Sequence, residues 1–427
     1  MPHINDFPPE ILGEIFVQVT IPESQDISFP SKINFASPAP YSPNYRSVAS
    51  PYSISHVSRR WRDIALTTAS LWSRLCVVQP QSELIVRLLE EWMTRAGCVP
   101  MRLSLFEHSY KPSSSVTVAV LVLFLNSIHR CREFEMEVKT LAGRQPDYSR
   151  IDIRECTDLL QSVSVRDETP DSTATYRPFI MTRLLSSPNL RFVQWHHHQL
   201  LPLSVAAHFW SELRELRFET TEVDLVDLGY ALSYCQGLER LAVFSIHILH
   251  SRLAPVSLPR LTHLSASSEV MAFFDYLTVP SLTDLEILGG ELEGAWSFVL
   301  RMLWKSKAVP RVLKLHCVST HWPVKEEELL RALAMPCFAA LQVLEVEHLV
   351  GPRTIEFLLS SLNLPHLGRL VLIIDPYMPS LSTLLSALVY SRVYSRLGSP
   401  NWPDINMNRY VEYTSDGFRL SLDILSK

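Results

Sequence analysis

A run of three histidines, His196-His197-His198, is the stretch whose residue type most suggests chemistry, because imidazoles are common ligands of zinc. Neighbouring residues of a β-strand point to opposite faces, so the three side chains cannot all reach one ion. A second stretch, Gly289-Gly290 with Gly294, has the wrong spacing for a loop that binds phosphate. We therefore expect no metal site and no cofactor at either place.

The sequence lacks the usual signatures of an enzyme active site. It contains no G-x-S-x-G elbow, no H-E-x-x-H motif, no Walker A loop and no EF-hand loop. None of its 7 cysteines lies in a C-x-x-C pair, and most lie in apolar stretches, where cysteine behaves as a small hydrophobic residue. We expect reduced, structural cysteines and a protein that is not an enzyme, with a hydrolase on an α/β fold as an alternative.

Composition and charge exclude several other classes of protein. The 427 residues are 47% hydrophobic, so the chain can bury a large core. Its net charge of -5 is not the basic excess of a nucleic-acid-binding protein. The longest apolar run, residues 116–125, is far shorter than the roughly 20 residues of a membrane span, and the first residues lack the features of a secretory signal. We expect a cytoplasmic and/or nuclear protein that binds neither nucleic acid nor membrane.

Two amphipathic helices are predicted near the N-terminus. The first follows Asn5 and Asp6, either of which can cap it, and the second begins near Ser53, before a short third element. Residues 21–50 between them are rich in proline and serine, which predicts a mobile loop. The apolar residues of these elements are Ile11, Leu12, Ile15, Phe16 and Val19, then Ile54, Val57, Trp61 and Ile64, then Leu71, Trp72 and Leu75.

These segments resemble the F-box, especially in the form common in large fungal F-box families. The matching stretches are Phe7-Pro8-Pro9-Glu10-Ile11-Leu12, Ile15-Phe16, Val57-Ser58-Arg59-Arg60-Trp61 and Leu71-Trp72. The resemblance implies helices that dock on a Skp-family adaptor. By position, it assigns the adaptor contact to Pro8, Ile11, Leu12, Ile15, Phe16, Val57 and Trp61. Two alternatives stay open: Trp61 could belong mainly to the core, and the helices could open an all-helical domain.

The rest of the sequence repeats the unit L-x-x-L-x-(apolar) at spacings of about 21 to 30 residues. The last two positions of each unit alternate as in a short strand with one buried face, and a helical pattern follows before the next unit. Units of this kind bury their apolar faces only by stacking on one another. The units begin at Pro100, Cys131, Leu160, Leu190, Leu213, Leu238, Leu261, Leu282, Val312, Leu341 and Leu367.

This pattern resembles a leucine-rich-repeat solenoid. The sequence therefore predicts an α/β fold in which a small helical F-box precedes a solenoid with a parallel sheet on its concave side. The asparagine that usually follows the repeat motif is absent, so we expect a divergent array. The alternative is a doubly wound α/β domain, although no glycine-rich turn between strand and helix supports it.

Alternation along the strands also predicts which side chains line the concave surface. Such surfaces are where repeat arrays bind partners. We take the charged residues there as candidates for substrate binding: Glu133, Glu135, Glu215, Arg217, Arg240, His263, Glu286, Lys314 and Glu345.

The predicted organisation is an F-box-like domain at residues 1–76 and a repeat solenoid at residues 77–427, with the clearest repeats in 184–375. This arrangement resembles a substrate receptor of a cullin-based, SCF-type ubiquitin ligase. The resemblance implies a Skp-family adaptor, a cullin bound through it, and an unknown protein substrate marked for degradation. The alternative is a non-catalytic leucine-rich scaffold that binds the adaptor without driving ubiquitination.

Overall fold

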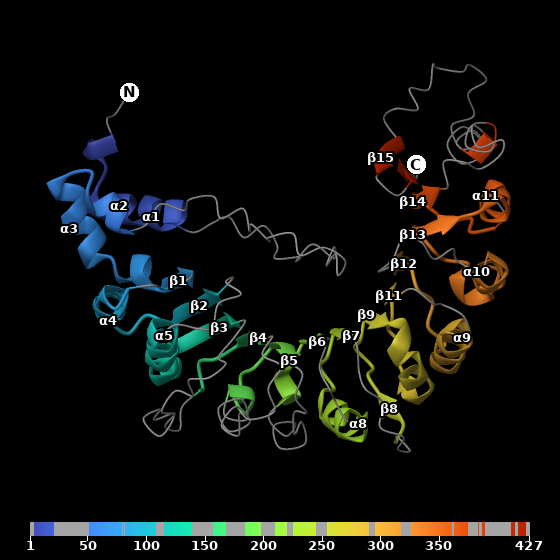
Figure 1. Cartoon of the computed structure of the whole chain (residues 1–427), viewed down its shortest axis with the longest axis horizontal. Helices are drawn as coiled ribbons and strands as arrows, with labels where there is room; N and C mark the ends of the chain where they lie inside the picture. The colour runs from blue at the N-terminus through green and yellow to red at the C-terminus, as the bar shows by residue number, and fades with distance from the viewer. Residues whose placement is uncertain are drawn as a thin grey trace. The chain divides into compact units, whose positions relative to one another are not determined.

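The computed structural model describes residues 4–20, 51–78, 80, 82–107, 115–138, 157–167, 184–197, 210–219, 225–244, 254–289, 295–316, 326–360, 363–374, 383, 387–388, 411–414 and 417–423. The chain divides into an N-terminal unit, Met1–His198, and a C-terminal unit, Gln199–Lys427. Helices come first, and parallel strands that alternate with helices follow in both units (Figure 1). The predicted α/β class is confirmed, and the arrangement is consistent with a leucine-rich-repeat-like solenoid. The loop predicted at residues 21–50 lies outside the described residues.

The helices that open the N-terminal unit are short and surround a small core. Pro9 begins the longest of them, where its missing N–H costs nothing, and Glu10 lies in its first turn. Leu12 and Phe16 of this helix are buried. The elements are η1 (Ile4–Asp6), α1 (Pro9–Thr20), α2 (Pro51–Ser55), α3 (Arg59–Thr67) and η2 (Ala69–Trp72).

The second predicted helix is wrong in one respect, because it is two helices separated at residues 56–58. The backbone of Ser58 is extended, and its hydroxyl accepts a hydrogen bond from the Trp61 amide at 3.1 Å, which caps α3. The break removes Val57 from the face on which it was predicted to lie with Ile54 and Ile64. Those two side chains are buried, whereas Val57 is exposed.

Five parallel strands follow in the N-terminal unit, each paired with the next one along the chain. Residues predicted to be buried in them are buried, for example Leu103, Val163 and Trp195. The first of these strands contains residues 76 and 77, between which the sequence predicts the domain boundary. The position of that boundary stays a prediction. The strands are β1 (Arg74–Val78), β2 (Met101–Glu107), β3 (Cys131–Val138), β4 (Ser162–Asp167) and β5 (Phe192–His197), and the helices between them are α4 (Leu84–Ala96), α5 (Ser115–Asn126) and η3 (Ile128–Arg130).

The main sheet of the C-terminal unit has seven parallel strands among the described residues, again in chain order. A doubly wound sheet reverses its strand order at one point, so this order excludes that alternative within each unit. Figure 1 shows α9, α10 and α11 side by side along the strands. The strands are β6 (Glu215–Glu219), β7 (Arg240–Phe244), β9 (His263–Ser267), β11 (Asp284–Leu288), β12 (Val312–His316), β13 (Val343–Val350) and β14 (Arg369–Ile374). The helices are η5 (Trp210–Glu212), α8 (Leu225–Tyr234), η6 (Ser268–Tyr276), α9 (Ala295–Ser306), α10 (Glu326–Leu333), η7 (Pro336–Phe338) and α11 (Pro352–Leu359).

Two antiparallel strands, β16 (Gly417–Asp423) and β15 (Val411–Thr414), extend this sheet beyond β14. The sequence predicted only parallel strands, because the repeat motif does not reach these residues. A separate two-stranded sheet joins β8 (Val256–Ser257) and β10 (Leu277–Thr278).

In several repeats, a backbone carbonyl just before the strand accepts hydrogen bonds from two amides of the next repeat. These bonds fix the register between the two repeats. The Thr262 carbonyl accepts hydrogen bonds from the amides of Thr283 and Asp284 at 3.0 and 2.9 Å. The Thr283 carbonyl accepts in the same way from Arg311 and Val312, at 2.7 and 3.0 Å. The arrangement recurs at the carbonyls of Gln161, Arg214, Glu239, Arg311 and Gln342.

The predicted register of the repeat at Val312 is wrong. Leu313 and Leu315 are its buried strand residues, and Leu313 pairs with Leu285 of the preceding strand. The unit therefore begins at Pro310, where proline takes the place of the first leucine of the motif.

Aromatic side chains join the N-terminal helices to the first repeat. The indole of the buried Trp72 donates a hydrogen bond to the Ala65 carbonyl at 2.8 Å, and the Trp92 indole of α4 donates to the Trp72 carbonyl at 2.7 Å. The rings of Trp72 and Trp92 meet edge to face, and Tyr52 meets both. The Arg95 guanidinium lies 4.6 Å from the Trp72 ring centroid. The two parts therefore share a core.

A carboxylate from one repeat caps the helix of the next. Glu326 of α10 accepts hydrogen bonds from the amide and the hydroxyl of Thr354 in α11, at 3.0 and 2.8 Å. A Cβ atom on Gly351 would lie only 2.5 Å from a Glu326 carboxylate oxygen, so glycine makes this close approach possible.

We expect Glu326→Ala to lower the free energy of unfolding by about 1 kcal/mol, the usual effect of losing a helix cap. The neighbouring Glu327 is the matched control, since its exposed ion pair with Arg353 should contribute less than about 0.5 kcal/mol. Urea denaturation of both alanine variants measures the difference. Equal effects would mean that the cap does not stabilise the repeat stack.

Candidate functional site

The residues predicted to contact an adaptor include both exposed and half-buried side chains. Ile11 is 47% exposed and Val57 is 61% exposed. Pro8 is also exposed, and Ile15 is half-buried. Exposed apolar side chains such as these can be covered by a partner.

The other three predicted contact residues support this surface from beneath it. Leu12 and Phe16 are 0% and 2% exposed, and the Phe16 ring lies 4.7 Å from that of the half-buried Trp61, centroid to centroid. A Cβ atom on Gly13 would lie 3.2 Å from the Thr68 hydroxyl, so α1 approaches the residue after α3 closely.

A long-range hydrogen bond ties the two parts of this helical region together. The Arg60 guanidinium of α3 donates to the Phe7 carbonyl before α1, at 2.7 Å. The segments on either side of residues 21–50 therefore contact each other directly.

Along each strand, buried side chains alternate with side chains on the opposite face of the sheet. We call this opposite face the open face of each unit. In the N-terminal unit, Glu133 on this face forms an ion pair with Arg102 at 2.6 Å. Glu135 accepts a hydrogen bond from the Ser104 hydroxyl at 3.2 Å. Burial raises the pKa of Glu135, and the bond from Ser104 opposes that rise. This part of the open face is acidic and partly desolvated.

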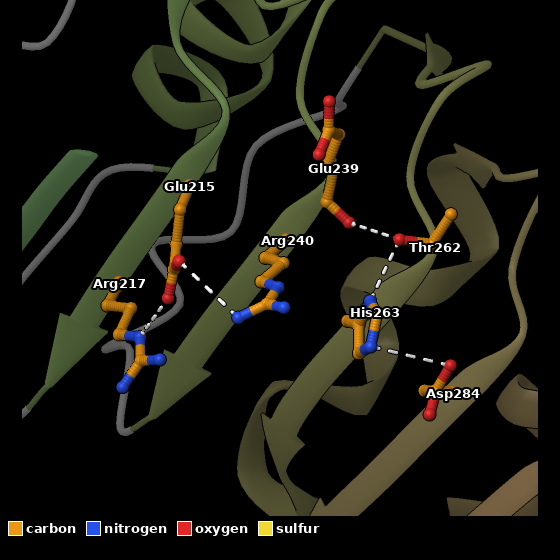
Figure 2. Close-up of polar contacts among 7 residues, drawn as sticks. All are labelled: Glu215, Arg217, Glu239, Arg240, Thr262, His263 and Asp284. Carbon is orange, nitrogen blue, oxygen red and sulfur yellow. Dashed lines mark hydrogen bonds and ion pairs between the residues drawn. The ribbon is translucent and has the colours of Figure 1, made fainter. Parts of the chain in front are cut away.

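In the C-terminal unit, one glutamate on the open face contacts two arginines. Figure 2 shows Glu215 between Arg217 on its own strand and Arg240 on the next strand. The carboxylate lies 2.6 Å from the Arg217 Nε and 3.9 Å from the Arg240 Nη1. The longer distance makes the Arg240 contact the weaker of the two.

His263 has a defined ring orientation on the next strand. The Thr262 hydroxyl lies 3.1 Å from the Glu239 carbonyl and 2.8 Å from the Nδ1 atom of His263 (Figure 2). The His263 ring therefore has a polar side chain at each of its two nitrogens. Its Nε2 atom faces the Asp284 carboxylate at 3.5 Å.

His316 lies between two carboxylates and is the most buried charged group of this face. Its Nδ1 atom lies 2.8 Å from Glu347 and its Nε2 atom lies 2.9 Å from Glu286, which also accepts a hydrogen bond from Ser265. Burial by itself would lower the pKa of His316, but the two carboxylates outweigh burial and raise the pKa to about 9. The imidazole is therefore cationic at neutral pH.

His316 is not among the candidates that the sequence predicted for this face. The signal that could have found it is the register, which sets His316 opposite Glu347 on β13 and diagonal to Glu286 on β11. Sequence reasoning did select Lys314 and Glu345, which form an ion pair at 3.6 Å, and Glu345 also pairs with Arg369 at 3.5 Å.

All nine residues predicted as substrate contacts lie on an open face, and the charged groups there contact one another.

The described residues contain no group of three histidine, cysteine or acidic side chains that could hold a metal ion. His198 and the stretch 290–294 lie outside the described residues. No described helix has the length and hydrophobicity that a membrane span requires. The described arrangement is suited to recognition through ion pairs.

Comparison with protein families supports the reading of the N-terminal helices. Residues 4–78 match the family model described as F-box-like. The match covers the two helical segments and ends with β1. Comparison with curated proteins gives no match to the chain.

The chain thus carries an F-box-like domain at residues 4–78, followed by a long run of parallel strands. In general terms, such a domain implies a substrate-receptor role in an SCF-type ubiquitin ligase, with a Skp-family adaptor as its partner. Proteins with this domain are typically non-catalytic.

The raised pKa of His316 predicts how stability changes with pH. Folding favours the protonated imidazole, so its contribution is fully present below about pH 6.5 and is lost as the pH rises through about 9. The contribution is about 3 kcal/mol at most. Urea denaturation between pH 6 and 10 should show this loss in the wild type, and a flatter profile in His316→Gln.

The control is Lys314→Gln, which removes a cation from the same strand but leaves His316 between its carboxylates. It should keep the wild-type pH profile. A wild-type protein whose stability stays constant from pH 7 to 10 would contradict the ion-paired state of His316.

Proposed function

We propose that this chain is a substrate-recognition subunit of an SCF-type ubiquitin ligase. Its F-box-like domain, of the form common in large fungal families, docks on a Skp-family adaptor that in turn binds a cullin. Its repeats are divergent leucine-rich repeats that bind a protein substrate. The chain catalyses nothing itself and raises the effective concentration of substrate near the conjugating enzyme. It acts in the cytoplasm, the nucleus or both.

The observation that carries this proposal is the F-box-like match at residues 4–78, in a region that leaves Ile11 and Val57 exposed. Covering apolar surface contributes roughly 25 cal/mol per Å², so two such side chains favour association with a partner. We assign direct contact to Pro8, Ile11, Ile15 and Val57. Leu12, Phe16 and Trp61 hold these residues in position.

The open faces are the proposed substrate-binding surfaces. They are supported as such by the rows of charged side chains that the parallel strands present. The candidates are Glu133, Glu135, Glu215, Arg217, Arg240, His263, Glu286, Lys314 and Glu345.

Co-purification distinguishes the ligase from the scaffold that binds the adaptor alone. A ligase subunit brings down both the adaptor and a cullin. A scaffold brings down the adaptor without a cullin, and recovery of neither contradicts both functions.

Substitution of the exposed residues tests the adaptor surface. Ile11→Asp and Val57→Asp each place a charge in an interface that binding desolvates, so each should weaken adaptor binding at least tenfold. Both positions are exposed in the chain itself, so the melting temperature should stay within about 2 °C. Isothermal titration with purified adaptor and a melting curve measure the two effects.

Two controls complete this experiment. Leu88→Asp alters an exposed leucine of α4 outside the F-box-like match and should leave adaptor binding unchanged. Leu12→Asp buries a charge and should unfold the domain, so a loss of binding there does not report on the interface. Adaptor binding that survives the Ile11→Asp, Val57→Asp double substitution would contradict the assignment of these residues to the adaptor-binding surface.

A further inference from the structure

The most exposed large apolar side chain among the described residues is a tryptophan near the end of α9. Trp304 is 82% exposed, whereas Trp296, Val299, Met302 and Leu303 of the same helix are buried. The helix therefore buries its apolar stripe against the rest of the repeat and leaves one indole outside it. Tryptophan is among the side chains that most often anchor a protein interface.

Two lysines lie beside this indole. Lys305 follows Trp304 in the last turn of α9, and its ammonium group donates a hydrogen bond to the backbone carbonyl of Asp275 at 3.2 Å. The backbone amide of Lys307 donates to the Trp304 carbonyl at 3.2 Å, so this residue lies directly after the last turn. Both lysines are exposed, and within the described residues neither forms an ion pair with a carboxylate.

The carboxylate of Asp275 already has another cation as its partner. It accepts two hydrogen bonds from the Arg301 guanidinium, at 2.8 and 2.9 Å, and this guanidinium also lies 4.8 Å from the Phe298 ring centroid. These two charges balance each other, so the positive charge of the two lysines remains at the end of the helix. Every charged residue between positions 295 and 316 is basic, namely Arg301, Lys305, Lys307, Arg311 and Lys314.

Lys307 has a backbone conformation that glycine adopts at a lower cost. Its φ is 54°, in the left-handed region, and α4 ends at Gly97 with a φ of 55°. The positive charge of a lysine interacts favourably with the C-terminal end of a helix dipole. The dipole accounts for cations near this helix end, but it does not account for an exposed tryptophan among them.

We propose that the end of α9, formed by Trp304, Lys305 and Lys307, binds an acidic segment of a partner protein. An apolar side chain of the segment packs on the indole, and its carboxylates pair with the two lysines. The indole provides the apolar contact area, and the lysines orient the segment and speed its association. The proposal does not depend on the proposed function, because none of these residues belongs to the F-box-like match or to the open face.

The charge of the chain favours a short protein segment over a nucleic acid or a membrane. The net charge is -5, so a long polyanion or an extended anionic surface is repelled by the rest of the molecule. A short segment meets mainly the charges within one Debye length, about 8 Å at physiological salt. A helix that lies on a membrane presents a whole apolar face, whereas α9 buries its apolar face and exposes one indole.

The test uses the full chain and a labelled synthetic peptide in fluorescence anisotropy. The probe carries leucine and phenylalanine between two pairs of glutamates. We expect a Kd below about 1 mM, an affinity at least tenfold lower for the same peptide with glutamines, and weaker binding at high salt. Binding should also shift the tryptophan emission of the chain to shorter wavelength, and Trp304→Phe should lack this shift.

Matched variants locate the binding. Trp304→Ala and the Lys305→Gln, Lys307→Gln double variant should each lower the affinity at least tenfold. All three side chains are exposed, so the melting temperature should stay within about 2 °C. Arg331→Gln is the control, because it removes an exposed cation of α10 that already pairs with Glu327 at 3.6 Å, and it should leave the affinity unchanged.

One further variant separates binding from folding. Lys307→Gly removes a cation that the peptide contacts, but it places glycine at a positive φ. It should weaken binding about threefold while the melting temperature equals or exceeds that of the wild type.

Three outcomes overturn the proposal. The first is no binding of the probe at about 1 mM, and the second is unchanged binding by Trp304→Ala. The third is displacement of the probe by a single-stranded oligonucleotide or by phosphatidylserine vesicles at a lower concentration than by the unlabelled peptide, which would identify the site as one for a nucleic acid or a membrane.

Discussion

The rest of the structure depends on one constraint: no single repeat can bury its own leucines or satisfy its own strand edge. Leu264 and Leu285 are buried because neighbouring strands stand in register, and the Thr262 carbonyl completes two hydrogen bonds of the following repeat. Register is therefore set twice, by apolar burial and by a backbone bond that needs no particular side chain. This redundancy explains how the array keeps its order although its motif is divergent and Pro310 interrupts it.

Fixed register has a direct consequence for the open faces. Side chains on adjacent strands are held about 4.8 Å apart, so like charges repel and opposite charges attract across the rows. The clearest result is His316 on β12, which lies between Glu286 on β11 and Glu347 on β13 and attracts both carboxylates. Side chains ordered in this way lose little conformational entropy on binding, which suits a face to recognise a partner.

Periodicity in the sequence could predict the strands and helices whose position depends on burying apolar side chains. It failed where one local or neighbouring polar group determines the structure. The alternation of Leu103, Val163 and Trp195 gave the strands and their buried faces. It could not show that Ser58 would cap α3 and turn Val57 outward, because capping depends on one hydroxyl and one amide. Helical spacing likewise placed Ile11 and Leu12 in one stripe without saying which of them would be covered. The antiparallel strands β15 and β16 lack the repeat motif, so no periodic pattern in the sequence predicted them.

The contact between the F-box-like helices and the first repeat connects the two halves of the proposed function. Trp92 belongs to α4, yet its indole completes the hydrogen bonding of Trp72, whose own indole bonds to the carbonyl of Ala65 in α3. Deleting the repeats would leave Trp72 without its edge-to-face partner and would expose apolar rings to water. The helical region and the first repeat therefore stabilise each other. A receptor that must hold its substrate at a defined place relative to an adaptor needs such a stiff connection, because a flexible linker would dilute the effective concentration that the assembly provides.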